Sequence, residues 1–269
     1  MEILNQQRCV SSFFTQNTLN EPETWREIMD RKPLVPARNK LLSSLLLLST
    51  IIAIPVREVS AVDHWEGGYV GSKTEGDAQT PVWNFIKNFT WNQYYWAETF
   101  QFDSWNNERV DKMDFAYFVG HGSPWSIKCQ STWLDLSSAG ASAHKGWGDN
   151  NAEFVTLHAC NVVASPLEAA DWYSAWTNDD GVFDGVHQVC GFRTGASMSC
   201  DQDISEYFGS RVKAGAAVWQ AWFDAISLCG DGDERGAAVM YPPCDGDSYA
   251  VFSADPPENH TWLRIWYQL

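Results

Sequence analysis

Two short runs of apolar residues, at 114–119 and 153–157, constrain the fold of this chain more than any other feature. The first run is followed by Gly120, His121 and Gly122, and the second by His158, Ala159 and Cys160. Apolar runs of this length suit strands that are buried on both faces of a parallel sheet. About 30 residues separate the two runs, which is enough for one right-handed crossover between neighbouring strands. The sequence therefore predicts an α/β fold.

The remaining pattern predicts a three-layer sandwich with a mostly parallel central sheet flanked by helices. Apolar residues at helical spacing indicate three helices, and shorter apolar runs indicate further strands. We expect helices at 81–102, 166–177 and 203–228, and further strands at 62–71, 186–192, 237–241, 249–252 and 262–266.

Residues 1–61 have the pattern of a leader, and residues 62–269 are long enough for one domain. The apolar run 41–56 follows basic residues and precedes small ones, as in a signal peptide. It is shorter than the roughly 20 residues of a membrane-spanning helix. We predict cleavage after Ala61, no stable membrane anchor, and a location outside the cell or in the secretory-pathway lumen. Translation from Met29 would suit this interpretation, whereas translation from the first residue favours a signal anchor.

The charge of the chain limits its partners. A formal net charge of −16 argues against nucleic acid, because phosphate binding requires clustered lysines and arginines. The acidity favours a cationic partner or serves solubility alone. Two glycosylation sequons, at Asn88 and Asn259, fit a glycoprotein of the secretory route.

Six of the seven cysteines follow the predicted leader, and in an oxidising compartment all six can form disulfides. We expect two disulfides among the later cysteines and a spare Cys129, which can pair with Cys160 in a latent state. A free Cys160 leaves an odd number, so the parity of the cysteines opposes a nucleophilic role. The later cysteines are Cys190, Cys200, Cys229 and Cys244.

His121 and Cys160 are the candidate catalytic pair. Parallel strands end at one edge of their sheet, and neighbouring strands lie about 4.8 Å apart, so these side chains can meet there. An imidazole can take the proton of a thiol and leave a nucleophilic thiolate. The Gly122 N–H, with that of Cys160, can face a developing oxyanion.

An apolar strand ending in His121-Gly122, followed by one ending in Ala159-Cys160, resembles the caspase, legumain, gingipain and clostripain group of cysteine peptidases. The similarity covers roughly residues 114–223 and is greatest to uncharacterised caspase-like domains of bacteria and fungi. The resemblance implies a cysteine peptidase or transpeptidase with Cys160 as nucleophile and His121 as general base and acid.

The same resemblance implies that the exit of the strand at 186–192 helps to build a specificity pocket. We therefore expect Asn161, Arg193 and Thr194 to contact a peptide or small-molecule substrate. The chain has 15 tryptophans, and Trp125 and Trp147 fall in the crossover that would border the pocket. Acidic residues such as Asp201 and Asp203 can select a basic side chain, or only solvate the surface.

Three alternatives remain open at this stage. The fold can serve a secretory-pathway enzyme of small-molecule metabolism with a Trp-lined pocket, or a non-catalytic binding or effector protein. His121, His158, Cys160 and His144 can also hold zinc, although no tight ligand spacing supports it. We therefore predict no metal and no cofactor. His158 lies two residues before Cys160 and so on the same face of the strand; it can assist Cys160, although core packing is the simpler role.

Overall fold

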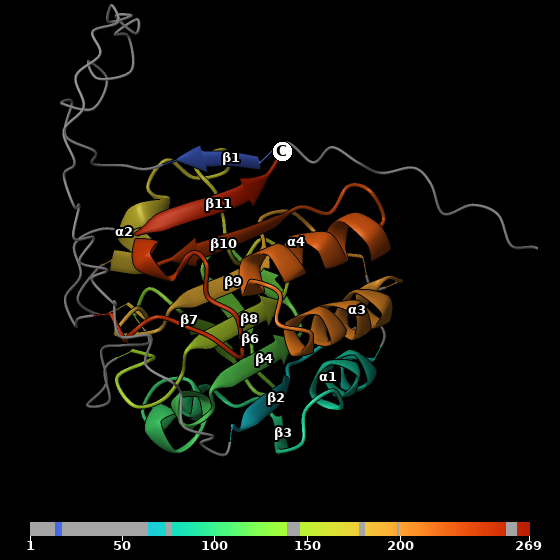
Figure 1. The fold of residues 1–269 in the computed structure, drawn as a ribbon, viewed down its shortest axis with the longest axis vertical. Coiled ribbons are helices and arrows are strands. Elements are labelled where there is room, and N and C mark those ends of the chain that lie inside the picture. Colours follow the sequence, from blue (N-terminus) through green and yellow to red (C-terminus); the bar gives the residue numbers. More distant parts are fainter. Residues whose placement is uncertain are drawn as a thin grey trace, which may run out of the picture. The chain divides into compact units, whose positions relative to one another are not determined.

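The computed structural model describes residues 14–17, 64–73, 77–138, 146–177, 181–197, 199–256 and 263–269, the first of these ranges by its backbone alone. An eight-stranded sheet in the order β1-β11-β10-β9-β8-β4-β2-β3 forms the centre of the fold (Figure 1). Its parallel strands are β2 (Glu66–Val70), β3 (Asn92–Trp96), β4 (Phe115–Val119), β8 (Phe154–His158) and β9 (Gln188–Phe192). The antiparallel strands are β10 (Gly236–Met240), β11 (Arg264–Gln268) and β1 (Phe14–Asn17). The prediction of an α/β fold with a mostly parallel sheet is confirmed.

The apolar runs at 114–119 and 153–157 correspond to β4 and β8, which are neighbours in the sheet. They pair in parallel, with Val119 opposite His158, so the residues that follow each strand emerge side by side. The Gly120 N–H donates to the His158 carbonyl over 3.2 Å and continues this pairing past the strand ends. All five residues of each strand are buried, as expected for strands covered on both faces.

Helices cover one face of the sheet. They are α1 (Gln79–Ile86), α3 (Asp201–Lys213) and α4 (Val218–Cys229), and they lie together in Figure 1. Phe85, Phe208 and Trp222 from these helices pack against β4 and β9 residues in one apolar cluster. Alternate strand residues such as Phe115 and Tyr117 point into this layer.

The opposite face is covered mainly by other elements. A second, antiparallel sheet consists of β5 (Gly122–Ser123), β6 (Ser126–Lys128) and β7 (Trp133–Asp135). It fills the connection between β4 and β8. Apolar residues of this sheet and of α2 (Trp172–Thr177) join one cluster with the sheet residues of that face. The remaining short elements are 3-10 helices: η2 (Thr99–Gln101), η3 (Asn106–Glu108), η4 (Val110–Lys112) and η6 (Pro242–Cys244).

Several predicted element boundaries are wrong. The helix expected at 81–102 ends at Ile86, and the chain then forms β3, whose residues are half-buried or exposed. The helix expected at 203–228 is two helices, because Gly215 between them adopts φ +85° and breaks the hydrogen-bonding ladder. Only Trp172–Thr177 of the helix expected at 166–177 forms. Residues 249–252 form an isolated bridge, between Ser248 and Val251, in place of a strand.

Most of the predicted leader, with the apolar run 41–56 and Ala61, lies outside the described residues. Strand β1 comes from that leader and pairs with β11 along the edge of the sheet. Within the described ranges, no helix has the length and apolarity that crossing a membrane requires.

The cysteines differ from the expectation. The six described cysteines are all free thiols, so neither the two later disulfides nor a Cys129–Cys160 bridge is present. The amide of Asn88, one of the two sequon residues, donates to the carbonyls of Asn84 and Phe85. The other sequon residue, Asn259, lies outside the described residues.

Candidate functional site

A pocket of about 400 Å³ opens at the carboxyl edge of the parallel strands. His121 and Cys160, the predicted pair, both line it. They follow β4 and β8 at equivalent positions of the register, since Val119 faces His158 and each residue stands two further along. The other lining residues are Lys73, Gly120, His158, Ala159, Ala196, Ser197, Ser199 and Asp201.

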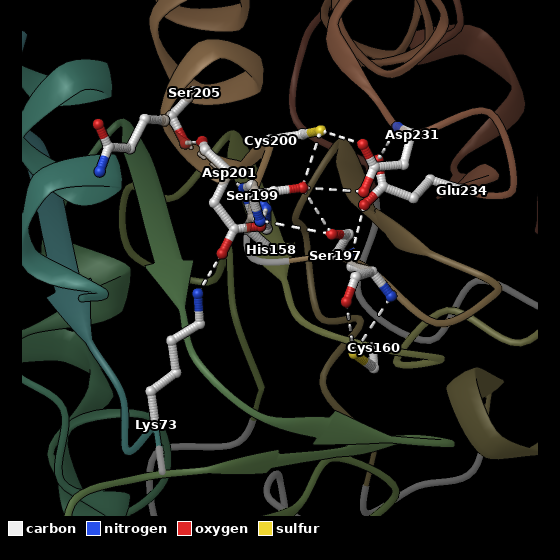
Figure 2. A network of polar contacts seen from close by, with 12 residues as sticks. Lys73, His158, Cys160, Ser197, Ser199, Cys200, Asp201, Ser205, Asp231 and Glu234 are labelled. Atoms are coloured by element: carbon white, nitrogen blue, oxygen red, sulfur yellow. Dashed lines mark hydrogen bonds and ion pairs between the residues drawn. The ribbon is translucent and has the colours of Figure 1, made fainter. Parts of the chain in front are cut away.

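Cys160 is a half-buried free thiol held by the backbone of Ala196. The Ala196 N–H points at the sulfur over 3.3 Å, and the thiol lies 3.7 Å from the Ala196 carbonyl oxygen (Figure 2). These two contacts fix the position of the sulfur beside the segment that follows β9. The sulfur is thus positioned and accessible from the pocket.

The chain turns sharply directly after Cys160. Asn161 has φ +55°, a left-handed conformation that non-glycine residues seldom adopt. The Asn161 N–H donates to the Thr194 carbonyl over 2.9 Å, which ties this turn to the segment that follows β9. Uncommon backbone conformations of this kind cluster at functional sites, because they can direct a side chain where a regular helix or strand cannot.

The backbone around His121 is equally fixed. Its N–H donates to the Ser72 carbonyl, and its carbonyl accepts the Lys128 N–H over 2.9 Å. The next residue, Gly122, packs so closely that an added Cβ would lie 2.6 Å from the Cys160 carbonyl oxygen. Only glycine fits there, which explains the His-Gly dipeptide. Gly122 lies beside the pocket and does not line it.

A buried ionic network forms the inner wall of the pocket (Figure 2). Asp201, the first residue of α3, accepts a hydrogen bond from His158 Nε2 over 2.7 Å and pairs with the ammonium of Lys73 through its other oxygen. All three side chains are at most 8% exposed. Burial would raise the pKa of Asp201, but His158 and Lys73 together lower it to about 2. Asp201 is therefore ionised at neutral pH.

The network continues away from the pocket on the other side of His158. The Tyr117 hydroxyl lies 2.7 Å from His158 Nδ1 and 2.7 Å from the Ser205 hydroxyl. The Ser205 hydroxyl in turn donates to the Asp201 carbonyl. Both ring nitrogens of His158 thus have polar partners, and the ring cannot rotate without breaking two hydrogen bonds.

Polar and acidic groups surround the outer part of the pocket. The Ser199 hydroxyl and the Cys200 thiol donate to Asp231 over 2.9 and 2.7 Å. The Ser197 N–H donates to Glu234, whose pKa is raised mainly by burial. Burial and the Asp231 carboxylate raise the pKa of Cys200 to about 11, so this neighbouring thiol stays protonated.

The structure places several residues that we expected to contact a substrate outside the lining of the pocket. Trp147 is fully buried, and its indole N–H donates to the Phe102 carbonyl in the core. Arg193 is held by Glu168 and by the Gln268 carbonyl, so its guanidinium joins β9 to β11. The Thr194 hydroxyl accepts the Arg235 N–H. Trp125 lies in the turn between β5 and β6, outside the residues that line the pocket.

Sequence reasoning missed the ionic network. His158, for which core packing is the simpler prediction, is buried at 2% exposure and also lines the pocket. The sequence predicts Asp201 as a selector of basic side chains or a solvated residue, whereas the structure shows it buried and paired with Lys73. Asp203 is exposed. The alternation of the strand places His158 on the side of Cys160, as expected, but it carries no signal for the partners Lys73 and Asp201.

The fold and this pocket together define an α/β protein with a free thiol at the carboxyl edge of its sheet. The chain belongs to the family described as a domain of unknown function (DUF6345), whose model matches residues 67–255. The match covers more than two thirds of the 269 residues and includes His121 and Cys160. No curated protein matches the chain.

Proposed function

We propose that this protein is a cysteine-dependent hydrolase or transpeptidase with a caspase-like fold. The observation that carries the proposal is the shared pocket, where His121 and the free thiol of Cys160 follow neighbouring parallel strands. The resemblance of these two strand ends to caspase-type peptidases supports the same roles. Secretion is part of the proposal and rests on the pattern of residues 38–61.

In the proposed reaction, His121 takes the proton of the Cys160 thiol as the sulfur attacks a carbonyl carbon. The C–N bond then breaks, and the imidazolium gives its proton to the leaving amine. Water, deprotonated by His121, attacks the thioester, releases the acid and restores the thiol. In a transpeptidase an amine takes the place of that water.

The surroundings of the pocket support a polar substrate. Lys73, His158 and Asp201 form one wall, and serines form part of the rest. Of the ten lining residues, none is a tryptophan, so the Trp-lined pocket of the small-molecule alternative has no support at this position. A peptide or another amide with polar groups near its carbonyl suits these walls better.

The test is alkylation of the folded protein by iodoacetamide, followed by a digest that locates the modified cysteine. Cys160 should react first, and His121→Ala should slow its modification at pH 7 by at least about tenfold, because the proton acceptor is lost. Cys160→Ala should abolish turnover of a peptide library in the same preparation.

Cys229→Ser is the matched control, since Cys229 is also half-buried but lies on α4. It should leave both readouts unchanged. Equal modification rates of Cys160 in the parent protein and in folded His121→Ala would refute the dyad. Turnover that survives Cys160→Ala would refute the nucleophile.

A further inference from the structure

A second group of ligating side chains lies at the opposite, amino edge of the parallel strands. Glu153 directly precedes β8 and His187 directly precedes β9. The His187 N–H donates to the Glu153 carbonyl over 2.9 Å, so the two residues are fixed as neighbours. One ligating atom each of Glu153, His187 and Asp255 lies within 4.8 Å of the others.

His187 is fully buried, and its two ring nitrogens are in different situations. Nδ1 lies 2.7 Å from an Asp247 carboxylate oxygen. Nε2 is also buried and makes no hydrogen bond, although Glu153 Oε2 lies 3.2 Å away. A histidine that gives its Nδ1–H to a carboxylate presents a lone pair at Nε2, and this is how metal-binding histidines are usually oriented.

From this arrangement we propose that His187, Glu153 and Asp255 bind one divalent transition-metal ion of the zinc class. Two zinc ligands at 2.0–2.2 Å, separated by a tetrahedral angle, lie about 3.3–3.5 Å apart. The His187 Nε2 to Glu153 Oε2 distance of 3.2 Å is close to that value. Mixed imidazole and carboxylate ligands favour zinc, manganese or iron over calcium and magnesium.

The charges around the cluster support a cation. Three carboxylates gather at His187: Glu153 Oε2 lies 3.2 Å from its Nε2, Asp247 lies 2.7 Å from its Nδ1, and Asp255 has an oxygen within 4.8 Å. The side chain of Asp114, whose carbonyl accepts the Glu153 N–H, is engaged elsewhere, because it accepts the Trp65 N–H over 2.7 Å and lies 3.0 Å from His64 Nδ1. A bound divalent ion would supply the positive charge that this edge lacks.

Cys244 and Asp247 form a second possible ligand group with His187. Asp247 is already engaged, since it accepts from both the N–H and the hydroxyl of Ser253 and faces His187 Nδ1. We therefore assign Asp247 the role of orienting His187.

The site is buried on its His187 side and open on its Asp255 side, since Asp255 is exposed. Three protein ligands leave a fourth position for water or another ligand. The ion would link the starts of β8 and β9 to the segment that follows Val251. This inference does not depend on the proposed function, because the two sites lie at opposite edges of the sheet.

The test uses the full chain with Cys160→Ser, so that the pocket thiol does not compete for metal. The protein is stripped with a chelator, shown to be folded by circular dichroism, and titrated with Zn²⁺, Ca²⁺ or Mg²⁺ in a calorimeter. We expect one Zn²⁺ per chain, bound more tightly than Ca²⁺ or Mg²⁺. X-ray absorption should show nitrogen and oxygen ligands only.

Asp255→Asn is the informative variant, because an exposed residue can be changed without disturbing the core. It should weaken Zn²⁺ binding at least about tenfold. Asp203→Asn, an exposed acid on α3, is the matched control and should bind like the parent. Absence of Zn²⁺ binding, preference for Ca²⁺, sulfur in the ligand shell, or equal affinities of the two variants would each overturn the proposal.

Discussion

The pKa of a buried acid is lowered at the carboxyl edge of the parallel sheet and raised at the amino edge. At the carboxyl edge, His158 and Lys73 surround Asp201 and lower its pKa to about 2. At the amino edge, burial and neighbouring acids together raise the pKa of Glu66 and of Glu153 to about 8. Asp201 is thus an ion with matched partners, whereas the other two favour a bound proton.

The difference shows that the charges at the carboxyl edge balance one another, whereas the acids at the amino edge suit a bound cation. Each edge has a buried histidine within 2.7 Å of an aspartate, His158 with Asp201 and His187 with Asp247. At the first edge Lys73 adds a cation, and the network is complete without a ligand. At the second edge an acid, Glu153, lies beside His187 in the place where the first edge has a cation.

The largest expected effect comes from removing the charge of the carboxyl edge. Asp201→Asn should lower the free energy of unfolding at pH 7 by about 3–5 kcal/mol, because Lys73 would remain as a buried, unpaired cation. Urea unfolding followed by tryptophan fluorescence measures this loss. Asp203→Asn, exposed on the same helix, should stay within about 0.5 kcal/mol. A loss below 1 kcal/mol in Asp201→Asn would show that the ion pair does not hold this edge.

An intermediate effect is expected from Tyr117→Phe. The change removes one hydroxyl and leaves His158 Nδ1 without its closest partner, at a cost of about 1–3 kcal/mol. The same unfolding measurement applies. Tyr94→Phe is the matched control, because it removes the hydroxyl of an exposed tyrosine of β3. If both variants unfold alike, the hydrogen bond to His158 contributes nothing measurable.

The smallest effect at pH 5 is expected for Glu66→Gln at the amino edge. Native Glu66 keeps its proton up to about pH 8, whereas an unfolded chain releases it near pH 4.5. The contribution of Glu66 is therefore present below pH 4.5 and lost as the pH rises to about 8, by at most about 1.4 kcal/mol per pH unit. Glu66→Gln should remove this loss, so the variant gains relative to the parent between pH 5 and pH 8.5.

Asp201 should show the opposite sign in the same experiment. Its stabilisation is present above about pH 3.8 and is lost as the pH falls toward 2, since its native pKa is the lower one. Unfolding curves of the parent and both variants across this range separate the two edges. A Glu66→Gln profile parallel to that of the parent would show that the pKa of native Glu66 is not raised, and that the two edges do not differ in this respect.

The sequence predicted the features that depend on local pattern. Buried apolar runs identified β4 and β8, and the end of each run placed His121 and Cys160 at one edge. Periodicity failed at 92–96, where aromatic residues at near-helical spacing form β3 beside β2. Pairing with a distant strand overrode the local preference there.

The network around Asp201 was beyond sequence reasoning for a different reason. Its members Lys73, His158 and Asp201 are far apart in the chain, and nothing in their local sequences links them. The sequence around Trp147 likewise did not predict that its indole N–H donates to the Phe102 carbonyl in the core. Partners of buried polar groups are set by tertiary packing, so a single sequence does not reveal them.

Strand β1 belongs to the predicted leader and also forms the edge of the sheet, so removal of the leader would change the folded domain. Its residues Phe14–Asn17 cover the backbone of β11, yet they precede the expected cleavage point after Ala61. Proteolytic maturation at that point would detach β1 and expose the hydrogen-bonding groups of β11. The released domain would then have an unpaired strand edge that can pair with a second copy of the domain. Cleavage of the leader would in this way favour self-association.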